Sequence, residues 1–132
     1  MCGVELTKTE ALRAYARMIN TLNVSPLEPL LADDVHYASQ KVFAEITSKQ
    51  DFLDYIKPKL RVIELGDRPL FAEMGILAAH HGGGPCVVLA QGTKDTLVGT
   101  VLIETAAGSI ARIDLCIVPP PETAKRLGDY PV

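Results

Sequence analysis

LFAEMGILAAH at residues 70–80, CVVLAQ at 86–91, LVGTVLIE at 97–104 and IARIDLCIV at 110–118 form a series of apolar runs. From residue 70 onward, the hydrophobic pattern of these runs is typical of β-strands. Short connections separate the runs, and each contains glycine or turn-prone polar residues. Because these connections fit hairpins and are too short for helical crossovers, we predict four consecutive antiparallel strands.

Two helical patterns precede the strands near the start of the chain. The sequence TKTE at 7–10 is a capping box, and apolar residues recur after it at helical spacing, which predicts a helix over about 8–22. Ser25 stands before Pro26, an arrangement that favours the start of a helix. We therefore expect one or two further helical turns over 27–32.

The region between these helices and the four strands contains one more strand and one more helix. Alternating polar and apolar residues at 35–43 predict a first strand. SKQD at 48–51 resembles a capping box, and apolar residues follow it at helical spacing up to Leu60. Pro58 lacks a backbone donor, so we expect a kink or an early end of this helix there.

Length and charge limit the kind of protein this is. The chain has 132 residues, with 13 basic and 16 acidic side chains and a net charge of −3. That size is typical of one domain over 1–132, with a core at about 7–118 and a surface tail or flap at 119–132. The chain has no run of basic residues, which argues against nucleic acid and anionic membranes as primary partners.

Hydropathy and cysteine usage favour the cytoplasm. The uncharged stretch 74–93 is long enough to suggest a membrane span, but histidines and glycines at its centre favour a hairpin. Charged residues interrupt the N-terminal region, so we expect no secretory signal. Cys2, Cys86 and Cys116 lack metal-site spacing, and we expect them to be reduced.

The order helix, short helix, strand, helix and four strands resembles the nuclear transport factor two-like superfamily. LLADDV at 30–35 resembles the segment that enters its first strand, and GSIARI at 108–113 resembles the opening of its last strand. The resemblance implies an α+β cone, in which a strongly curved antiparallel sheet wraps N-terminal helices around an apolar pocket. It also implies homodimers through the outer sheet face. The superfamily contains ketosteroid isomerases, polyketide cyclases, epoxide hydrolases and non-catalytic binding domains, so the fold does not select the function.

The resemblance points to positions where catalytic groups would lie. The position of the proton-abstracting aspartate of the isomerases falls at Ser39, which cannot act as that base. Ile113 and Leu115 would face the interior, and Asp114 would face away. A one-residue slip of this alignment would instead bring Asp114 inside. Tyr15 lies near the position of an oxyanion-hole tyrosine, although an ordinary core tyrosine is the alternative interpretation.

Further polar residues are candidates for lining the pocket. Glu73 and Glu104 interrupt apolar strands, and each either lines the pocket or marks the solvated face. Tyr37, Tyr55 and Gln91 could each give a hydrogen bond to a ligand, and packing in the core or at the rim is an equal alternative.

Three other motifs give weaker hypotheses. His36, His80 and His81 suggest a metal, but adjacent residues on a strand point to opposite faces, so we expect no metal site. The glycines at 82–84 precede a strand and not a helix, so we expect a hairpin and no phosphate site. Met1-Cys2 resembles the start of N-terminal nucleophile amidotransferases, whose further motifs are missing. We expect no cofactor.

The sequence therefore predicts a small-molecule-binding protein with a largely apolar pocket inside the cone. One alternative is an acid–base isomerase, cyclase or hydrolase for a small apolar substrate, with Asp114 or Glu73 as base and Tyr15 as hydrogen-bond donor. A second alternative is a non-catalytic dimerisation module. These hypotheses differ in what must lie inside the cone: a neutral cavity, an ionisable carboxylate or a filled core.

Overall fold

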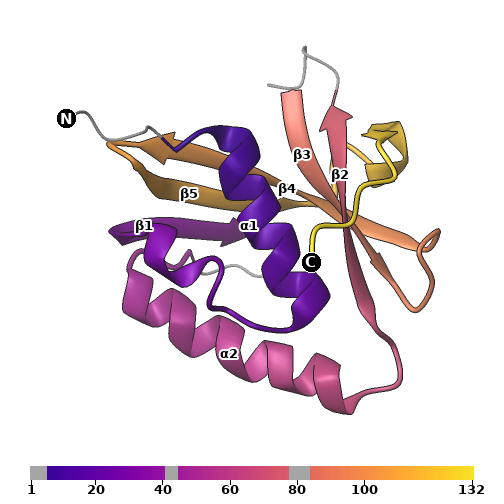
Figure 1. Ribbon diagram of the computed structural model, residues 1–132, viewed down its shortest axis with the longest axis horizontal. Helices are drawn as coiled ribbons and strands as arrows, with labels where there is room; N and C mark the ends of the chain where they lie inside the picture. The colour runs from indigo at the N-terminus through magenta and orange to yellow at the C-terminus, as the bar shows by residue number, and fades with distance from the viewer. Residues whose placement is uncertain (1–5, 41–44, 78–83) are drawn as a thin grey trace.

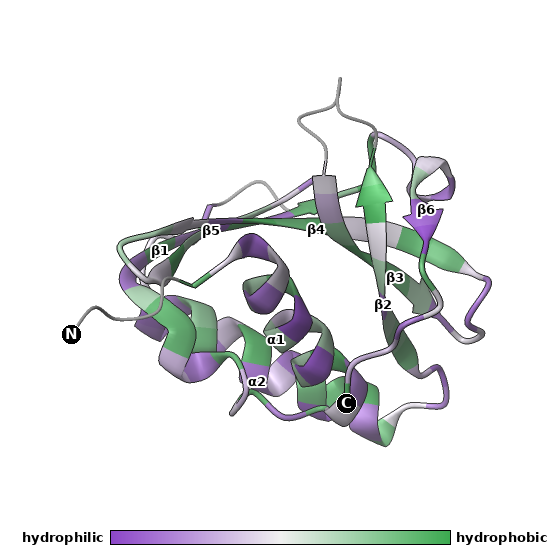
Figure 2. Cartoon of the chain, turned by 45° about the horizontal axis from the view of Figure 1, so that its top comes forward, coloured by the Kyte–Doolittle hydropathy of each residue, from purple (hydrophilic) through white to green (hydrophobic). Residues whose placement is uncertain are grey.

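The computed structural model describes residues 6–40, 45–77 and 84–132. These residues form one curved sheet with the strand order β1-β5-β4-β3-β2-β6, and both α-helices pack against the same face of it (Figures 1 and 2). The elements are α1 (Lys8–Thr21), η1 (Glu28–Leu30), β1 (Leu31–Ser39), α2 (Lys49–Leu65), β2 (Leu70–Leu77), β3 (Gly84–Gln91), β4 (Leu97–Ala106), β5 (Ser109–Cys116), η3 (Pro121–Thr123) and β6 (Lys125–Arg126). The predicted α+β cone is confirmed.

Helix α1 begins at the predicted capping box. The Thr7 hydroxyl accepts a hydrogen bond from the Glu10 backbone N–H at 3.1 Å, and the Glu10 carboxylate accepts one from the Thr7 N–H at 3.0 Å. The helix ends at Leu22, whose φ of 54° is left-handed. This conformation stops the helix because it turns the chain out of the helical path.

Helix α2 continues further than the sequence suggested. Its first turn is capped by Ser48, whose hydroxyl accepts from the Asp51 N–H at 3.1 Å. The expected early end at Pro58 is wrong, because α2 runs through it to Leu65. Pro58 lies on the exposed side of the helix, so the carbonyl of Asp54 that it leaves unpaired can be solvated.

The hairpin predictions are confirmed, and two strand contacts were not foreseen. β2 pairs antiparallel with β3, β3 with β4, and β4 with β5. β1 starts at Leu31 instead of 35, which shortens the preceding helical turn to η1, and it pairs parallel with β5. The end expected for this strand, 41–43, lies outside the described residues. The two-residue β6 pairs with β2.

The core lies between the sheet and the two helices. Across the sheet, Tyr37 pairs with Ile113, which pairs with Ile103, and all three side chains belong to the core. Leu12, Met18 and Ile19 of α1 and Phe52 and Ile56 of α2 close it from the other side. This face is therefore the inner face of the sheet.

The C-terminal segment is held at the edge of the sheet. β6 lies beside β2, and the last residues reach α1 (Figure 1). There Arg13 pairs with Asp129, and the side-chain amide of Asn20 donates to the Pro131 carbonyl at 2.7 Å. The segment expected to be a surface tail or flap is bonded to β2 and α1, and we call residues 119–132 the strap. In the described part of the chain, no helix is long and apolar enough to cross a membrane.

Candidate functional site

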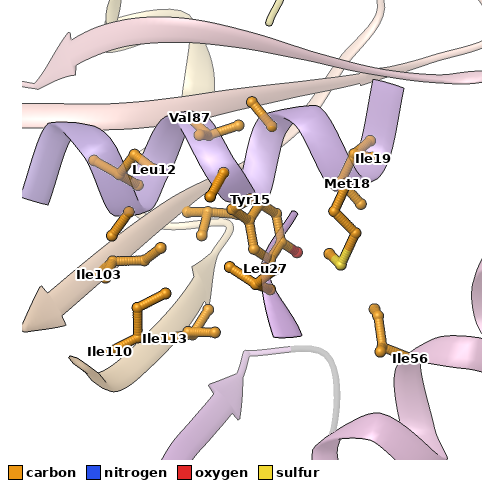
Figure 3. Close-up of a cluster of buried hydrophobic side chains, with 14 of the residues drawn as sticks. Leu12, Tyr15, Met18, Ile19, Leu27, Ile56, Val87, Ile103, Ile110 and Ile113 are labelled. Carbon is orange, nitrogen blue, oxygen red and sulfur yellow. The ribbon is translucent and has the colours of Figure 1, made fainter. Parts of the chain in front are cut away.

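Four of the hydroxyl side chains singled out from the sequence meet at the inner face. Tyr15 projects from α1 among apolar side chains (Figure 3), Tyr37 and Ser39 come from β1, and Tyr55 comes from α2. The Tyr37 and Tyr55 ring centroids are 5.4 Å apart, and those of Tyr37 and Phe52 are 5.3 Å apart. Residues separated by 40 positions thus converge, and we call Tyr15, Tyr37, Ser39 and Tyr55 the hydroxyl cluster.

Burial keeps the inner tyrosines of this cluster in their neutral form. Tyr15 is 3% and Tyr37 2% exposed, and desolvation raises the pKa of both phenols well above the ordinary value. The neighbouring tyrosines raise the pKa of Tyr37 further, while a hydrogen bond with Ser39 acts in the opposite direction. Because they hold their protons, these hydroxyls can donate hydrogen bonds and do not act as anions.

Tyr55 connects the hydroxyl cluster with the surface. It is half-buried, and Lys59 one helical turn later donates a hydrogen bond to its hydroxyl at 3.1 Å. The Lys59 ammonium also lies 5.3 Å from the centroid of the Tyr55 ring. The hydroxyl cluster therefore extends from the buried core to the exposed ammonium group of Lys59.

Ile113 and Leu115 form the apolar wall beside the cluster. Ile113 pairs with Tyr37, and Leu115 pairs with Ser39 in the parallel β1·β5 ladder. Both are buried and belong to the core. Their neighbour Asp114 has the opposite parity and lies on the outer face, where its carboxylate accepts from the Arg112 guanidinium at 3.0 Å. A carboxylate in this position has a charged partner and is separated from the cluster by the sheet.

Glu45 and His36 extend the polar cluster around Asp114. Arg112 also donates to Glu45 at 2.8 Å, and His36 Nδ1 lies 3.2 Å from the same carboxylate. The hydrogen bond with His36 lowers the pKa of Glu45, and Arg112 adds to this effect. The described residues contain no group of three or more histidines, cysteines or carboxylates that could hold a metal ion.

Glu73 lies neither in the interior nor on the solvated face, the two places that the sequence suggested. It points to the outer face of β2 and is 4% exposed beneath the C-terminal strap. Its carboxylate accepts from Arg126 Nε at 2.7 Å, from the Gly128 N–H at 2.7 Å and from the Tyr130 hydroxyl at 3.2 Å. Arg126 escaped the sequence reasoning because only pairing of the strap with β2 brings it to Glu73.

The remaining candidate residues lie elsewhere. Gln91 ends β3, where its backbone N–H donates to the Thr96 carbonyl across a turn. Glu104 is exposed, as its solvated interpretation predicted. Cys86 is buried and free, and burial raises its pKa to about 11. Cys2, His80, His81 and the glycines at 82 and 83 lie outside the described residues.

This geometry has counterparts among solved structures. No family model matches the chain, and no curated protein matches its sequence. A nuclear transport factor two-like protein of unknown function from Cytophaga hutchinsonii superimposes with a TM-score of 0.60 and 9% identity, over 92% of this chain and 98% of that one. The chain has the nuclear transport factor two-like fold.

Two further solved structures resemble this chain. A candidate ketosteroid isomerase from Kribbella flavida has a TM-score of 0.58 and 24% identity, over 82% of this chain and 76% of its own. A hypothetical protein with a ketosteroid isomerase-like fold from Catenulispora acidiphila, in complex with trimethylamine, has a TM-score of 0.56 and 18% identity, over 83% and 85%. At these identities the likeness shows the fold alone.

Proposed function

We propose that this chain binds a small, uncharged and largely apolar molecule at the hydroxyl cluster, with a hydrogen-bond acceptor of the ligand facing the tyrosines. The observation that carries this proposal is the gathering of four hydroxyls from three elements in an otherwise apolar interior. Small-molecule sites combine apolar walls with a few placed polar groups in this way.

The protonation state of the cluster favours a neutral ligand with an acceptor group. Tyr15 and Tyr37 keep their protons because burial raises the pKa of each. A carbonyl or ether oxygen can accept from such donors without bringing a charge into the core, whereas an anion would lose its hydration there. Binding of trimethylamine by the Catenulispora acidiphila protein is consistent with a small ligand in this fold.

The placement of the carboxylates favours binding over acid–base catalysis. A base must come within hydrogen-bonding reach of the proton that it removes. Asp114 pairs with Arg112 and Glu73 with Arg126, both on the outer face. We therefore propose hydrogen bonding and orientation, and not proton transfer, as the role of Tyr15.

A homodimer through the outer sheet face also stays a proposal. The strap pairs with β2, and η3 packs against β4, so these parts of the outer face are already covered within one chain. A second copy would meet the outer face of β1 and β5, where Arg112 and Asp114 are half-buried. Two such ion pairs facing each other would supply complementary charges.

Binding can be tested with Prodan, a neutral naphthalene ketone whose fluorescence reports polarity and hydrogen bonding. We expect saturable binding with blue-shifted emission. Tyr15→Phe and Tyr37→Phe should each weaken it about fivefold, because each removes one hydrogen bond and keeps the ring. Tyr130→Phe, which changes a tyrosine of the strap, is the matched control and should leave the affinity unchanged. Equal affinity for all four proteins, or no binding, would contradict the proposal.

A further inference from the structure

We propose a second ligand site, separate from the hydroxyl cluster, in a surface groove between α2 and the segment that follows α1. The ligand we infer is a small amphiphile with one anionic head group. The groove consists of two adjoining hollows with volumes of about 560 and 290 Å³. Leu22 and Glu64 line both hollows and therefore form the boundary that the two hollows share. Volumes of several hundred Å³ are typical of small-molecule sites.

The walls of the groove are largely apolar. Leu22, Val24 and Pro58 line the larger hollow, and Leu70 and Phe71 line the smaller one. Each of these five side chains is exposed in part, so a ligand could cover apolar surface that the fold itself leaves in water. Covering it stabilises a complex by roughly 25 cal/mol per Å² of apolar area removed from water.

Two cations stand at the larger hollow. Lys57 and Arg61 are one turn apart on α2, a spacing that puts both side chains on the same face of the helix. Within the described residues neither has an ion pair or a hydrogen bond to its side chain. Two neighbouring cations without partners repel each other, and an anion between them would relieve that repulsion.

The charges along the groove favour one orientation of the bound ligand. Glu64 lines both hollows, whereas Asp67 lines only the smaller one. An anionic head group is therefore attracted to Lys57 and Arg61 and repelled by Glu64 and Asp67. The apolar part of the ligand would extend toward Leu70, and a second anionic group there would be unfavourable.

The backbone at Leu22 supports a role for its side chain in the groove. Its φ of 54° lies in the left-handed region, where glycine is the usual helix-ending residue. A residue with a Cβ costs about 1 kcal/mol or more in this conformation. The leucine side chain that replaces glycine here lines both hollows.

The groove can be tested with a pair of fluorescent probes that differ by one anionic group. We would titrate the full chain with 1-anilinonaphthalene-8-sulfonate and with N-phenyl-1-naphthylamine, which has the same rings without the sulfonate. Wild-type protein should bind the sulfonate at least tenfold more tightly. The double variant Lys57→Gln/Arg61→Gln should lose this preference and keep its affinity for the neutral probe.

Two controls distinguish binding in the groove from binding elsewhere on the protein. Lys49→Gln/Arg68→Gln removes one lysine and one arginine that do not line the groove, and it should keep the tenfold preference. Tyr37→Phe should leave sulfonate binding unchanged, because Tyr37 belongs to the hydroxyl cluster. The proposal is overturned if the sulfonate does not bind, if the Lys57/Arg61 variant keeps the preference, or if Tyr37→Phe is the change that weakens sulfonate binding.

Discussion

The two faces of the sheet differ in how they satisfy their polar groups. On the inner face, Tyr37 and Ser39 lie among apolar side chains and beside further tyrosines from the helices. On the outer face, Glu73 and Asp114 each accept from an arginine. Neutral hydroxyl groups thus lie on the face toward the helices, and charged pairs lie on the face toward the strap and solvent.

Strand alternation produces this separation. Asp114 stands between Ile113 and Leu115, and Glu73 stands between Ala72 and Met74, all four of which are core residues. Successive side chains on a strand point to opposite faces. A shift of either strand by one residue would bring a carboxylate to the inner face and move two apolar side chains to the outer face, so the alternation also fixes the register.

The largest effect that would test this comparison is expected at Glu73. Glu73→Gln leaves Arg126 without its buried partner and weakens the bond to the Gly128 N–H. We expect a loss of about 2–3 kcal/mol in the free energy of unfolding, measured by urea denaturation. Asp95→Asn removes the other carboxylate on Arg126, which is 89% exposed, and should cost about 0.5 kcal/mol or less. Equal losses would mean that the strap is not anchored at Glu73.

The dependence of stability on alkaline pH tests whether Tyr15 is buried on the inner face. Burial raises the pKa of Tyr15 above the ordinary value of 10.0. Above that pH the unfolded chain releases the proton while the folded chain holds it, so stability is full below pH 10 and falls as pH rises. The slope is at most about 1.4 kcal/mol per pH unit for each such tyrosine. Tyr15→Phe should reduce the fall between pH 10 and 11, measured by denaturation at each pH. An unchanged slope would place Tyr15 in contact with water.

The smallest expected effect concerns one hydroxyl on the outer face. Thr100 is fully buried, and its Oγ1 has no hydrogen-bond partner in the described structure. Thr100→Val keeps the shape and removes this unpaired group, so we expect a gain of about 1 kcal/mol in unfolding free energy. Thr123→Val is the matched control, because its hydroxyl donates to the Pro120 carbonyl at 2.6 Å. That variant should lose stability, and losses in both would show that Thr100 has a partner.

The elements of this fold could be predicted because their signals are local. The capping box at Thr7 and the hairpin lengths each involve a few neighbouring residues. Pro58 misled the prediction because the cost of a proline depends on whether the carbonyl it leaves unpaired meets water, which the sequence around it does not state. The prediction that the Ile113 side chain faces the interior followed from the alternation of side chains along the strand together with the family resemblance.

The sequence by itself therefore determined the two α-helices and the five longer strands, together with the alternation of side chains along the last strand. Only the tertiary structure decided that Tyr15, Tyr37 and Tyr55 meet, that β1 lies parallel to β5, and that Arg126 covers Glu73. The physical reason is the distance along the chain over which each interaction acts. Caps, turns and alternation act over a few residues, whereas these contacts join distant segments and form only when the sheet curls around the helices and the strap closes over its edge.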